Sequence, residues 1–574
     1  MSCFTFAYAF VILIASWIIS HACLMPKPIP GIPFNFFAQY LPWGDLITLG
    51  LHYFRTGEVF RWLSLQSLHH ESSLIQLFLP SFSTVRPTLV LAELNAIEDI
   101  VTRRIGEIDR ADLMHTWFGL VVPKATIGLK SSSPIFRDQR RLWNVVVSPK
   151  FLDDVAAPCF VRAATQVADV WQKKAELLDL SRAFDAQEDV KLATLEGMWQ
   201  MLVGSKLGLL AASMETLHKP RPIKYLGDEM AVFVRPQMPE FYGVLGTLLM
   251  CLDWVMLGFS SRLYTWVFSY SGILGRAMQK KDTILDECII ASRRRVAAGA
   301  AGRTCALSEA IYKDLRLTSV SKAEREADSN AALRDELLEL LITGHETTAS
   351  SICWALKYLT DNPEVQGRLR NSLIGAFGCA KGTILPSARD LTSVSVPYLE
   401  AVVAETLRLS NTGPVSFRQT LVPCEVLGHQ VPAGTPIVLV TAGPSHSSPY
   451  MPSTFRDGDE KACRATYPRE RVYLPRSSHD SHDTPFHDHN VFAPERWLLS
   501  GKFDANSVRM LPFSAGSRGC FGKKIALLEL RIVIAVLVLR FEFPRLPEHL
   551  SGYEAQDGLT SRPQKCRVSP RAWR

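Results

Sequence analysis

The cysteines of this chain of 574 residues follow no spacing pattern of a known kind of site. Its 12 cysteines are scattered along the sequence, without a C-x-x-C pair and without the ligand spacing of a zinc site. Twelve cysteines are also too few for a disulfide scaffold in a chain of this length, which favours free thiols in a reducing compartment. A functional cysteine in this protein is therefore expected to act singly.

A large charge surplus is also absent. The net charge of +7 arises from 63 Lys and Arg against 56 Asp and Glu, spread over the whole length, which does not favour nucleic-acid binding. A hydrophobic content of 47% with 21% charged residues is typical of a globular protein and excludes disorder of the chain as a whole. With no internal repeat and no long Gly/Ser linker, one large domain is the expectation.

Charge is missing altogether before Lys27. Residues 4–25 form an apolar run that is long enough, at about 1.5 Å per residue, to cross a hydrocarbon core of about 30 Å. No basic residue precedes the run, so a signal anchor with a cytoplasmic body is favoured over a cleaved signal peptide or a buried core helix. The four prolines in residues 26–33 predict a linker that also acts as a stiff strap.

The hydrophobic pattern predicts a mainly α fold with a minor β sheet. Strand-like runs are short, and helical spacing recurs over long segments. The expected strands are 74–79, 88–91, 424–427 and 436–441, and the expected helices are 157–178, 189–210, 331–359, 364–376 and 396–409.

Two segments depart from this pattern. Residues 244–259 are apolar except for Asp253, which leaves a core helix, a membrane-dipping surface helix and a second span open. A span is disfavoured because a mid-membrane Asp costs about 2.5–3.5 kcal/mol. Residues 445–490 are polar, and their four clustered histidines predict a solvated loop rather than a metal site because no helix would hold the ligands.

A single cysteine near the C-terminus stands out. The segment contains Phe513, Gly516, Arg518, Cys520 and Gly522, and a strongly apolar helical run follows it. A thiolate is favoured where a helix begins, and the glycines allow close approach of the backbone. The pattern F-x-x-G-x-R-x-C-x-G resembles the signature of the cytochrome P450 family, the haem-thiolate monooxygenases. The resemblance implies that Cys520 is the axial ligand of the iron of haem b, with the loop residues around it in contact with the cofactor.

A second motif is similar to the helix K motif of that family. Glu405 and Arg408 are three residues apart and share one face of a predicted helix. Arg496, in a P-E-R segment, matches the third partner. The resemblance implies a structural triad that locks the core behind the haem.

The sequence TGHETT, residues 343–348, lies inside the predicted helix 331–359. Gly344 and the adjacent threonines weaken a helix, and their hydroxyls can bond back to carbonyls and open a local bulge with room for a small ligand. The segment resembles the distal helix I motif of the family. Glu346 and Thr347 then match the acid–alcohol pair that supplies protons for the activation of dioxygen.

The family resemblance also implies arginine partners for the two haem propionates, since buried negative charges need cations. Arg140, Arg418 and Arg518 match these positions. Phe136 departs from the family pattern W-x-x-x-R, and the lost indole N–H puts one propionate contact in doubt.

The implied reaction inserts one oxygen atom from O₂ into a lipophilic small molecule, in the style of fungal enzymes of secondary metabolism. No flavin or dinucleotide module occurs in the chain, so electrons are expected from NADPH through a separate membrane-bound reductase. Basic residues near the ligand loop suit an acidic partner of this kind. They are Lys523, Lys524, Arg137 and Arg141.

The expected organisation is an anchor at 4–25, a strap at 26–33 and a catalytic domain at 34–574, held at the endoplasmic reticulum by a single pass. Residues 445–490 are either a lineage-specific insertion or an artefact of the gene prediction. Two rival functions stay open: a haem-thiolate isomerase or dehydratase that needs no reductase, and a non-catalytic membrane haem protein. The pair Glu346–Thr347 disfavours the first, and the intact motifs disfavour the second.

Overall fold

The computed structural model describes residues 26–573. Residues 42, 81, 83–85, 179–181, 221–222, 228, 258–260, 300–303, 318–322, 379–384 and 442–490 are excepted. The expected anchor at 4–25 and the tract at 445–490 therefore lie outside the described residues.

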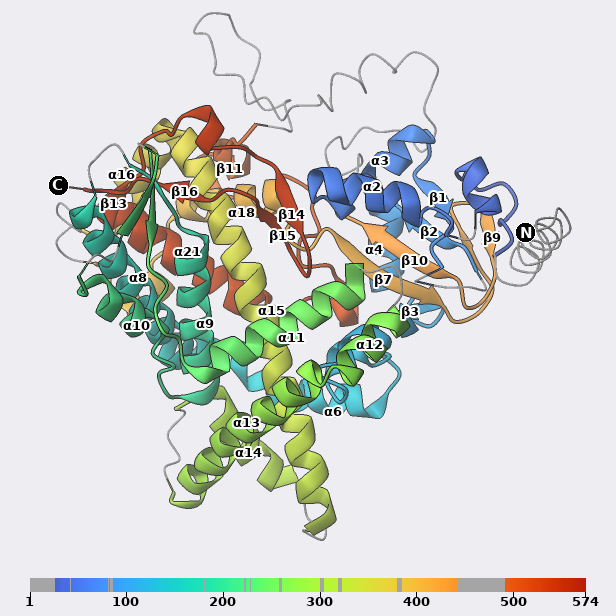
Figure 1. Ribbon diagram of the computed structural model, residues 1–574, viewed down its shortest axis with the longest axis horizontal. Coiled ribbons are helices and arrows are strands. Elements are labelled where there is room, and N and C mark those ends of the chain that lie inside the picture. The colour runs from blue at the N-terminus through green and yellow to red at the C-terminus, as the bar shows by residue number, and fades with distance from the viewer. Residues whose placement is uncertain are drawn as a thin grey trace, which may run out of the picture.

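One long helix, α15 (Ala323–Asp361), crosses the middle of the molecule (Figure 1). Its neighbours include α9, α18 and α21, and the mostly helical lobe that they form lies beside the main sheet (Figure 1). The helices that pack around this centre are α8 (Ala157–Leu177), α9 (Gln187–Val203), α10 (Leu209–Leu217), α16 (Pro363–Phe377), α18 (Pro397–Ser410) and α21 (Lys523–Arg540).

The other helices cover the edges of the molecule. They are α2 (Leu46–Thr56), α3 (Val59–His69), α4 (Leu94–Thr102), α5 (Asp112–Phe118), α6 (Pro134–Trp143), α7 (Pro149–Phe151), α11 (Glu240–Leu257), α12 (Ser261–Tyr270), α13 (Ile273–Ala297), α14 (Ala306–Leu317) and α17 (Ala388–Ser393), with 3₁₀ turns at η1 (Phe36–Tyr40), η2 (Thr126–Gly128) and η7 (Gly516–Arg518).

The main sheet has five strands in the order β1-β2-β10-β7-β3. Only the β2–β10 pair is parallel among these neighbours. The strands are β1 (Leu74–Leu77), β2 (Thr88–Leu91), β10 (Pro436–Val440), β7 (Val415–Thr420) and β3 (Ile108–Arg110). Two-stranded ribbons pair β4 (Phe184–Asp185) with β16 (Arg567–Val568), β5 (Ile223–Leu226) with β6 (Met230–Phe233), β8 (Cys424–Val426) with β9 (His429–Val431), β11 (Leu498–Leu499) with β12 (Lys502–Phe503), β13 (Phe541–Glu542) with β17 (Arg571–Ala572), and β14 (Ala555–Asp557) with β15 (Ser561–Pro563).

The mainly α prediction with a minor sheet is confirmed, but one predicted helix is divided. The apolar pattern over 189–210 belongs to two helices, α9 and α10. Gly204 and Gly208 between them have φ of 82° and 86°, a left-handed conformation that ends one helix and precedes the next. Periodicity alone missed this break because the apolar spacing continues across it.

The proline-rich segment 26–33 is fixed to the sheet. Ile29 and Ile32 are buried against it. The Gln76 side-chain amide donates to the carbonyls of Ile29 and Ile32 at 2.9 and 2.7 Å, and its oxygen accepts the Ile29 N–H at 2.8 Å. The strap is therefore part of the packed body.

Helix α11 contains most of the apolar segment 244–259. One of its faces is buried through residues such as Leu248 and Leu252, while Trp254 on the other face is 52% exposed. None of the helices in the described residues has the length and apolar composition needed to cross a membrane.

Candidate active site

The Cys520 loop folds back on itself before α21 begins. The Cys520 N–H donates to the Phe513 carbonyl at 2.8 Å, and the Ala526 N–H donates to the Gly522 carbonyl at 2.8 Å. Gly516 has φ of 67°, and a Cβ added there would lie 1.9 Å from the Val101 carbonyl oxygen. Only glycine fits this position, so the loop conformation follows directly from the sequence.

Cys520 is the one exposed cysteine of the eight that the structure describes. Surrounding protein desolvates its sulfur and raises the pKa of the thiol. The backbone N–H groups of Gly522 and Lys523, and the charges of Arg140 and Lys523, act in the opposite direction. A cysteine whose sulfur receives N–H groups at a helix start is suited to hold a ligand or a metal as a thiolate.

Four arginines from separate elements converge beside this loop. Arg110 of β3 and Arg418 of β7 lie directly opposite each other in the sheet. Arg140 comes from α6 and Arg518 from η7, and the Arg140 guanidinium donates to the Gly519 carbonyl at 3.5 Å. Burial and the charge of Arg110 lower the pKa of both Arg418 and Arg518 to about 9. Like charges this close destabilise one another unless an anion lies between them.

These four residues, Arg110, Arg140, Arg418 and Arg518, are called the arginine cluster. Several of its hydrogen-bond donors have no partner among the described residues. Arg110 Nε, Arg140 Nε and one Arg518 Nη are buried and have no hydrogen-bond partner. Arg518 also donates to Ser131 Oγ at 2.8 Å and to the Thr126 carbonyl at 3.2 Å. Buried donors without partners are costly, so the cluster is suited to bind an anionic group.

Acidic residues of α15 lie close to the arginine cluster. Glu336 accepts the Thr126 N–H at 2.7 Å, and Glu339 accepts the Ile127 N–H at 3.0 Å. Burial raises the pKa of both carboxyls, against the opposing charge of Arg140. These two carboxyls attach the η2 loop to α15, and the carboxylate of Asp109 lies 3.9 Å from Arg518 Nε.

The Phe136 ring replaces a tryptophan contact with stacking. The Arg518 guanidinium lies 3.9 Å from the ring centroid, and that of Arg140 lies 5.3 Å from it. A phenyl face attracts such cations but donates no hydrogen bond. The departure at this position therefore orients two arginines rather than contacting an anion itself.

The threonines of α15 bond back to the helix, as expected. Thr343, Thr347 and Thr348 donate to carbonyls four residues earlier at 2.8, 2.7 and 2.8 Å. The helix is nevertheless continuous from Ala323 to Asp361, so the expected bulge does not appear. Gly344 has a different role, because a Cβ there would lie 2.3 Å from Met198 Cε of the packed helix α9.

Glu346 is held as a carboxylate by Lys191 and His345. Its Oε1 lies 3.1 Å from Lys191 Nζ of α9 and 3.5 Å from His345 Nε2. Burial alone would raise the pKa of Glu346, but the hydrogen bond from His345 and the charges of His345 and Lys191 outweigh it and lower the pKa to about 2. Thr347 does not share this contact.

Glu405 lies at the centre of a dense ionic network. It accepts Arg408 at 2.8 Å on each oxygen and Arg496 Nε at 2.9 Å. Trp497 Nε1 and the Ala493 N–H complete its contacts at 2.9 and 3.0 Å. The expected triad is thus brought together, and Trp497 is an additional donor that the motif did not indicate.

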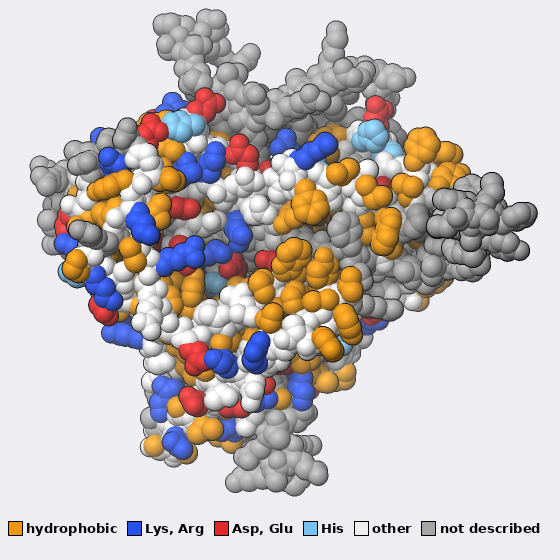
Figure 2. Space-filling model, in the orientation of Figure 1, with side chains coloured by type: hydrophobic (Ala, Val, Ile, Leu, Met, Phe, Trp, Pro, Cys, Tyr) orange, Lys and Arg blue, Asp and Glu red, His pale blue; other side chains and the backbone are white. Residues whose placement is uncertain are grey.

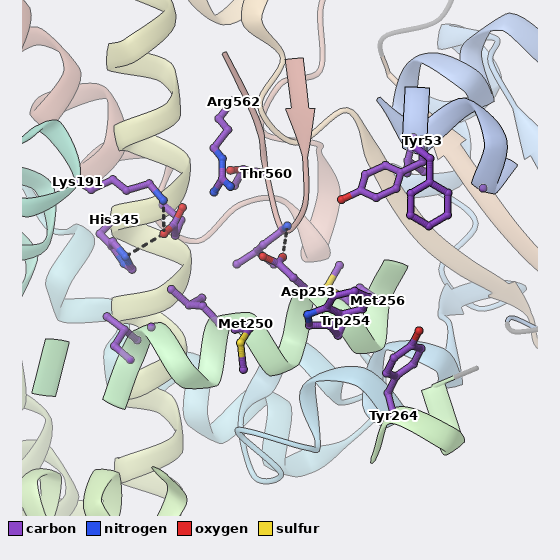
Figure 3. A pocket seen from close by; sticks show the side chains of 18 of the residues that line it. Tyr53, Lys191, Met250, Asp253, Trp254, Met256, Tyr264, His345, Thr560 and Arg562 are labelled. Carbon is purple, nitrogen blue, oxygen red and sulfur yellow. Dashed lines mark hydrogen bonds and ion pairs between the residues drawn. The ribbon is translucent and has the colours of Figure 1, made fainter. Parts of the chain in front are cut away.

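A cavity of about 540 Å³ lies between α2, α11, α15 and the β14–β15 hairpin (Figure 3). Its walls are mostly apolar, with Leu245, Leu249 and Trp254 from α11. His345 and Lys191 stand at one side of it and Arg562 points into it (Figure 3), and Glu346 also belongs to its lining. Volume and lining are typical of a small-molecule site.

Sequence reasoning missed Arg110 and Lys191. Arg110 carried no motif, and its three-residue strand β3 was not predicted. Lys191 is 155 residues from Glu346 in the chain. Neither contact has a local sequence signal, because each is made only when separate elements pack.

The comparison with known proteins agrees with the motifs described above. The sequence profile of the cytochrome P450 family matches residues 82–453 and 471–568 of this chain.

The chain belongs to the cytochrome P450 family. The gap in the match, residues 454–470, falls inside the tract 445–490 that the sequence indicates to be either an insertion or an artefact of the gene prediction.

Similar P450 enzymes come from fungi and from animals. Cytochrome P450 monooxygenase TRI13 of Fusarium sporotrichioides is 27% identical over 580 residues, covering 95% of each chain. Cytochrome P450 monooxygenase GME11363 of Pestalotiopsis microspora is 28% identical, covering 97% of this chain and 96% of the relative. Cytochrome P450 4V2 of Homo sapiens is 27% identical over 460 residues, covering 79% of this chain and 74% of the relative.

This P450 is therefore an oxidoreductase that incorporates oxygen, and its family implies haem with a cysteine thiolate ligand, a reductase partner and a small-molecule substrate. The described residues fit such a cofactor. They provide an exposed thiol at a helix start and, beside it, buried arginine donors that lack partners and suit carboxylates.

Proposed function

We propose that Cys520 is the thiolate ligand of haem b in a monooxygenase that hydroxylates or similarly oxidises a lipophilic small molecule. The observation that carries this proposal is the exposed Cys520 thiol beside the arginine cluster with its unpaired donors. When bound, haem supplies the activation of dioxygen and the transfer of one oxygen atom to the substrate. The residues of this chain bind, orient and supply protons.

Arg140, Arg418 and Arg518 would hold the two haem propionates, with Arg110 as a fourth cation. Two carboxylates would relieve the repulsion between Arg110 and Arg418 and occupy the unpaired donors. Phe513, Gly516 and Gly522 would shape the loop so that Cys520 faces the iron. The triad of Glu405, Arg408 and Arg496 would keep the core behind this loop rigid.

Thr347 and Glu346 would supply protons. A carboxylate with its pKa lowered to about 2 is ionised at neutral pH, so Glu346 receives a proton before it passes one on. The cavity that Glu346 lines provides a route for that proton from solvent. The Thr347 hydroxyl donates to the Thr343 carbonyl, which leaves its oxygen free to accept a hydrogen bond from water.

Membrane attachment is part of the proposal. Residues 4–25 would form a single-pass anchor in the endoplasmic reticulum, with residues 26–33 as a strap and 34–574 as the cytoplasmic catalytic domain, into which 445–490 is inserted. Large hydrophobic side chains are exposed over η1, α2 and the neighbouring helices α11 and α12 (Figure 2). This surface, with Phe37, Phe54 and Trp266 among its most exposed residues, would rest on the lipid.

Electrons would come from NADPH through a separate reductase, and the substrate would belong to fungal secondary metabolism. The fungal P450 relatives support that context, including one from Dothistroma septosporum that is named for the Hps1-dma1 cluster. Turnover without NADPH and O₂ would instead favour the isomerase or dehydratase alternative.

The test is a reduced carbon monoxide difference spectrum of the full chain. Wild type should give a Soret band of the thiolate type, and Cys520→Ala should lose it because the axial sulfur is gone. Cys288→Ala, at a half-buried cysteine on α13, is the matched control and should keep the band. A wild-type spectrum without the thiolate band would overturn the proposal.

A further inference from the structure

Arg518 of the arginine cluster is held by a serine that no sequence motif indicated. The Arg518 Nε donates to Ser131 Oγ at 2.8 Å, and the Ser131 hydroxyl donates in turn to Asp109 Oδ1 at 2.7 Å. The Ser131 N–H donates to Asp109 Oδ2, also at 2.7 Å. Backbone and side chain of Ser131 are thus fixed to one carboxylate. The hydroxyl therefore has a single orientation, with its proton toward Asp109 and a lone pair toward Arg518.

The Ser131 hydroxyl separates two opposite charges. Arg518 Nε lies 3.9 Å from Asp109 Oδ1, which is too far for a hydrogen bond, although each side chain is only 2% exposed. A guanidinium and a carboxylate that pair directly approach to about 2.7–2.9 Å, where the bond is charge-assisted. Ser131 gives a hydrogen bond to each oxygen of Asp109, so this carboxylate has partners without direct contact with Arg518.

The other contacts of Arg518 fix the plane of its guanidinium. One Nη donates to the Thr126 carbonyl at 3.2 Å, and the Phe136 ring lies against the guanidinium, with its centroid 3.9 Å away. Because Nε and one Nη are engaged, the planar fork cannot turn freely. The second Nη is buried and has no hydrogen-bond partner among the described residues. This free donor is therefore oriented before an anion binds, which lowers the cost of binding one.

The hydroxyl links three elements that are distant in the chain. Asp109 lies in β3, Ser131 stands just before α6, and Arg518 belongs to η7 in the cysteine loop. If these charges served the fold alone, a direct ion pair between Asp109 and Arg518 would balance them more fully. The interposed serine instead leaves much of the guanidinium charge available on the side of the free Nη.

We propose that Ser131 is a positioning residue for haem, whose hydroxyl keeps Arg518 from pairing directly with Asp109 and so reserves the free Nη for a haem propionate. This inference rests on the proposed haem-thiolate function and adds to it a residue that acts through Arg518. Without the hydroxyl, Arg518 would move onto Asp109, and the arginine cluster would lose one cation that is available to the cofactor.

The test compares haem-loaded full-length variants by the rate of haem transfer to apomyoglobin and by the reduction potential of the haem. Ser131→Ala should lose haem about tenfold faster, which corresponds to about 1.4 kcal/mol and to part of one charge-assisted bond. Its potential should become more negative, because a cation that favours the reduced haem moves away from it. Ser131→Thr, which keeps the hydroxyl, should behave as wild type in both measurements.

Asp109→Asn removes the charge onto which Arg518 would move. The loss of a negative charge favours the reduced haem, so the potential of this variant should become more positive, opposite to that of Ser131→Ala. The double variant Ser131→Ala/Asp109→Asn should retain haem better than Ser131→Ala, because Arg518 no longer has an anion to pair with. Ser132→Ala, at the exposed neighbouring serine, is the matched control and should behave as wild type.

Three outcomes would each overturn the proposal. They are a wild-type rate of haem loss in Ser131→Ala, potentials that shift in the same direction in Ser131→Ala and Asp109→Asn, and a double variant that loses haem as fast as Ser131→Ala. The carbon monoxide spectrum of Ser131→Ala should keep its thiolate band. A missing band in wild type concerns the haem assignment, whereas normal haem retention in Ser131→Ala with the band intact concerns Ser131 alone.

Discussion

Two buried groups of arginines in this protein differ in how their charges are balanced. Around Glu405, both carboxylate oxygens are occupied, and Arg408 and Arg496 share one anion. In the arginine cluster, four guanidinium groups converge, and three of them carry a buried donor without a partner. The first group balances its charges within the protein, whereas the second has one carboxylate, Asp109 at 3.9 Å from Arg518, and keeps unpaired donors that suit a further anion. Balance, rather than burial, distinguishes a structural ion network from a binding site.

The largest loss of stability should come from removing the charge of Glu405, the centre of the balanced ionic network. Glu405→Gln preserves the shape of the side chain but leaves two buried cations without their anion, so the free energy of unfolding should fall by about 3–5 kcal/mol. Urea unfolding followed by circular dichroism measures this. Glu98→Gln, which removes the partner of Arg509 at the surface, should cost less than about 1 kcal/mol. Equal losses in the two variants would contradict the distinction.

An intermediate effect is expected at Lys191, where one cation balances a single carboxylate. Lys191→Met should lower the free energy of unfolding by about 1–3 kcal/mol at neutral pH. The pKa of Glu346 is depressed from 4.5 to about 2 in the folded protein, so the stabilisation is present above about pH 4.5 and is lost as the pH falls toward 2. The difference in the free energy of unfolding between Lys191→Met and wild type should therefore decrease as the pH falls from about 4.5 to about 2. A gap that is independent of pH, or a similar loss in the exposed control Lys219→Met, would argue against this pairing.

A substitution in the arginine cluster should not destabilise the haem-free protein, in contrast to a substitution in the triad around Glu405. Arg418→Met removes a buried cation that faces Arg110, so the haem-free protein should change by less than about 1 kcal/mol or become more stable. Haem should leave the variant about tenfold faster, as a lost charge-assisted bond implies. Unfolding of both forms and haem transfer to apomyoglobin measure the two quantities, with exposed Arg103→Met as the control. A large loss of stability in the haem-free variant would mean that the cluster is structural.

The smallest effect on stability is expected at Thr347. Its hydroxyl bonds back to its own helix and alanine is the better helix former, so Thr347→Ala should change the free energy of unfolding by less than about 0.5 kcal/mol. Haem should be retained, but the fraction of NADPH that ends in product should fall and peroxide should rise. Thr348→Ala, which removes an equivalent back-bond, is the matched control. Unchanged coupling in Thr347→Ala would mean that protons reach the site by another route.

The sequence predicted the helices of the core better than their ends. Its periodicity located α8, α15, α16 and α18 within a few residues, except that α15 begins earlier, at Ala323. The division between α9 and α10 was missed because a left-handed glycine leaves no trace in an apolar pattern. The expected bulge in α15 was wrong, since Gly344 there serves close packing against Met198. The roles assigned to Cys520, Glu346 and Thr347 stay predictions.

The sequence by itself determined the family, the helical architecture and the loop that presents Cys520, because these depend on short-range spacing and on glycines that no other residue can replace. Only the tertiary structure decided which charges meet. Packing sets Arg110 opposite Arg418, pairs Lys191 with Glu346 and places Arg562 in the lining of the cavity beside α15. The physical reason is that a buried charge is defined by its partners, and its partners are chosen by packing rather than by the residues next to it.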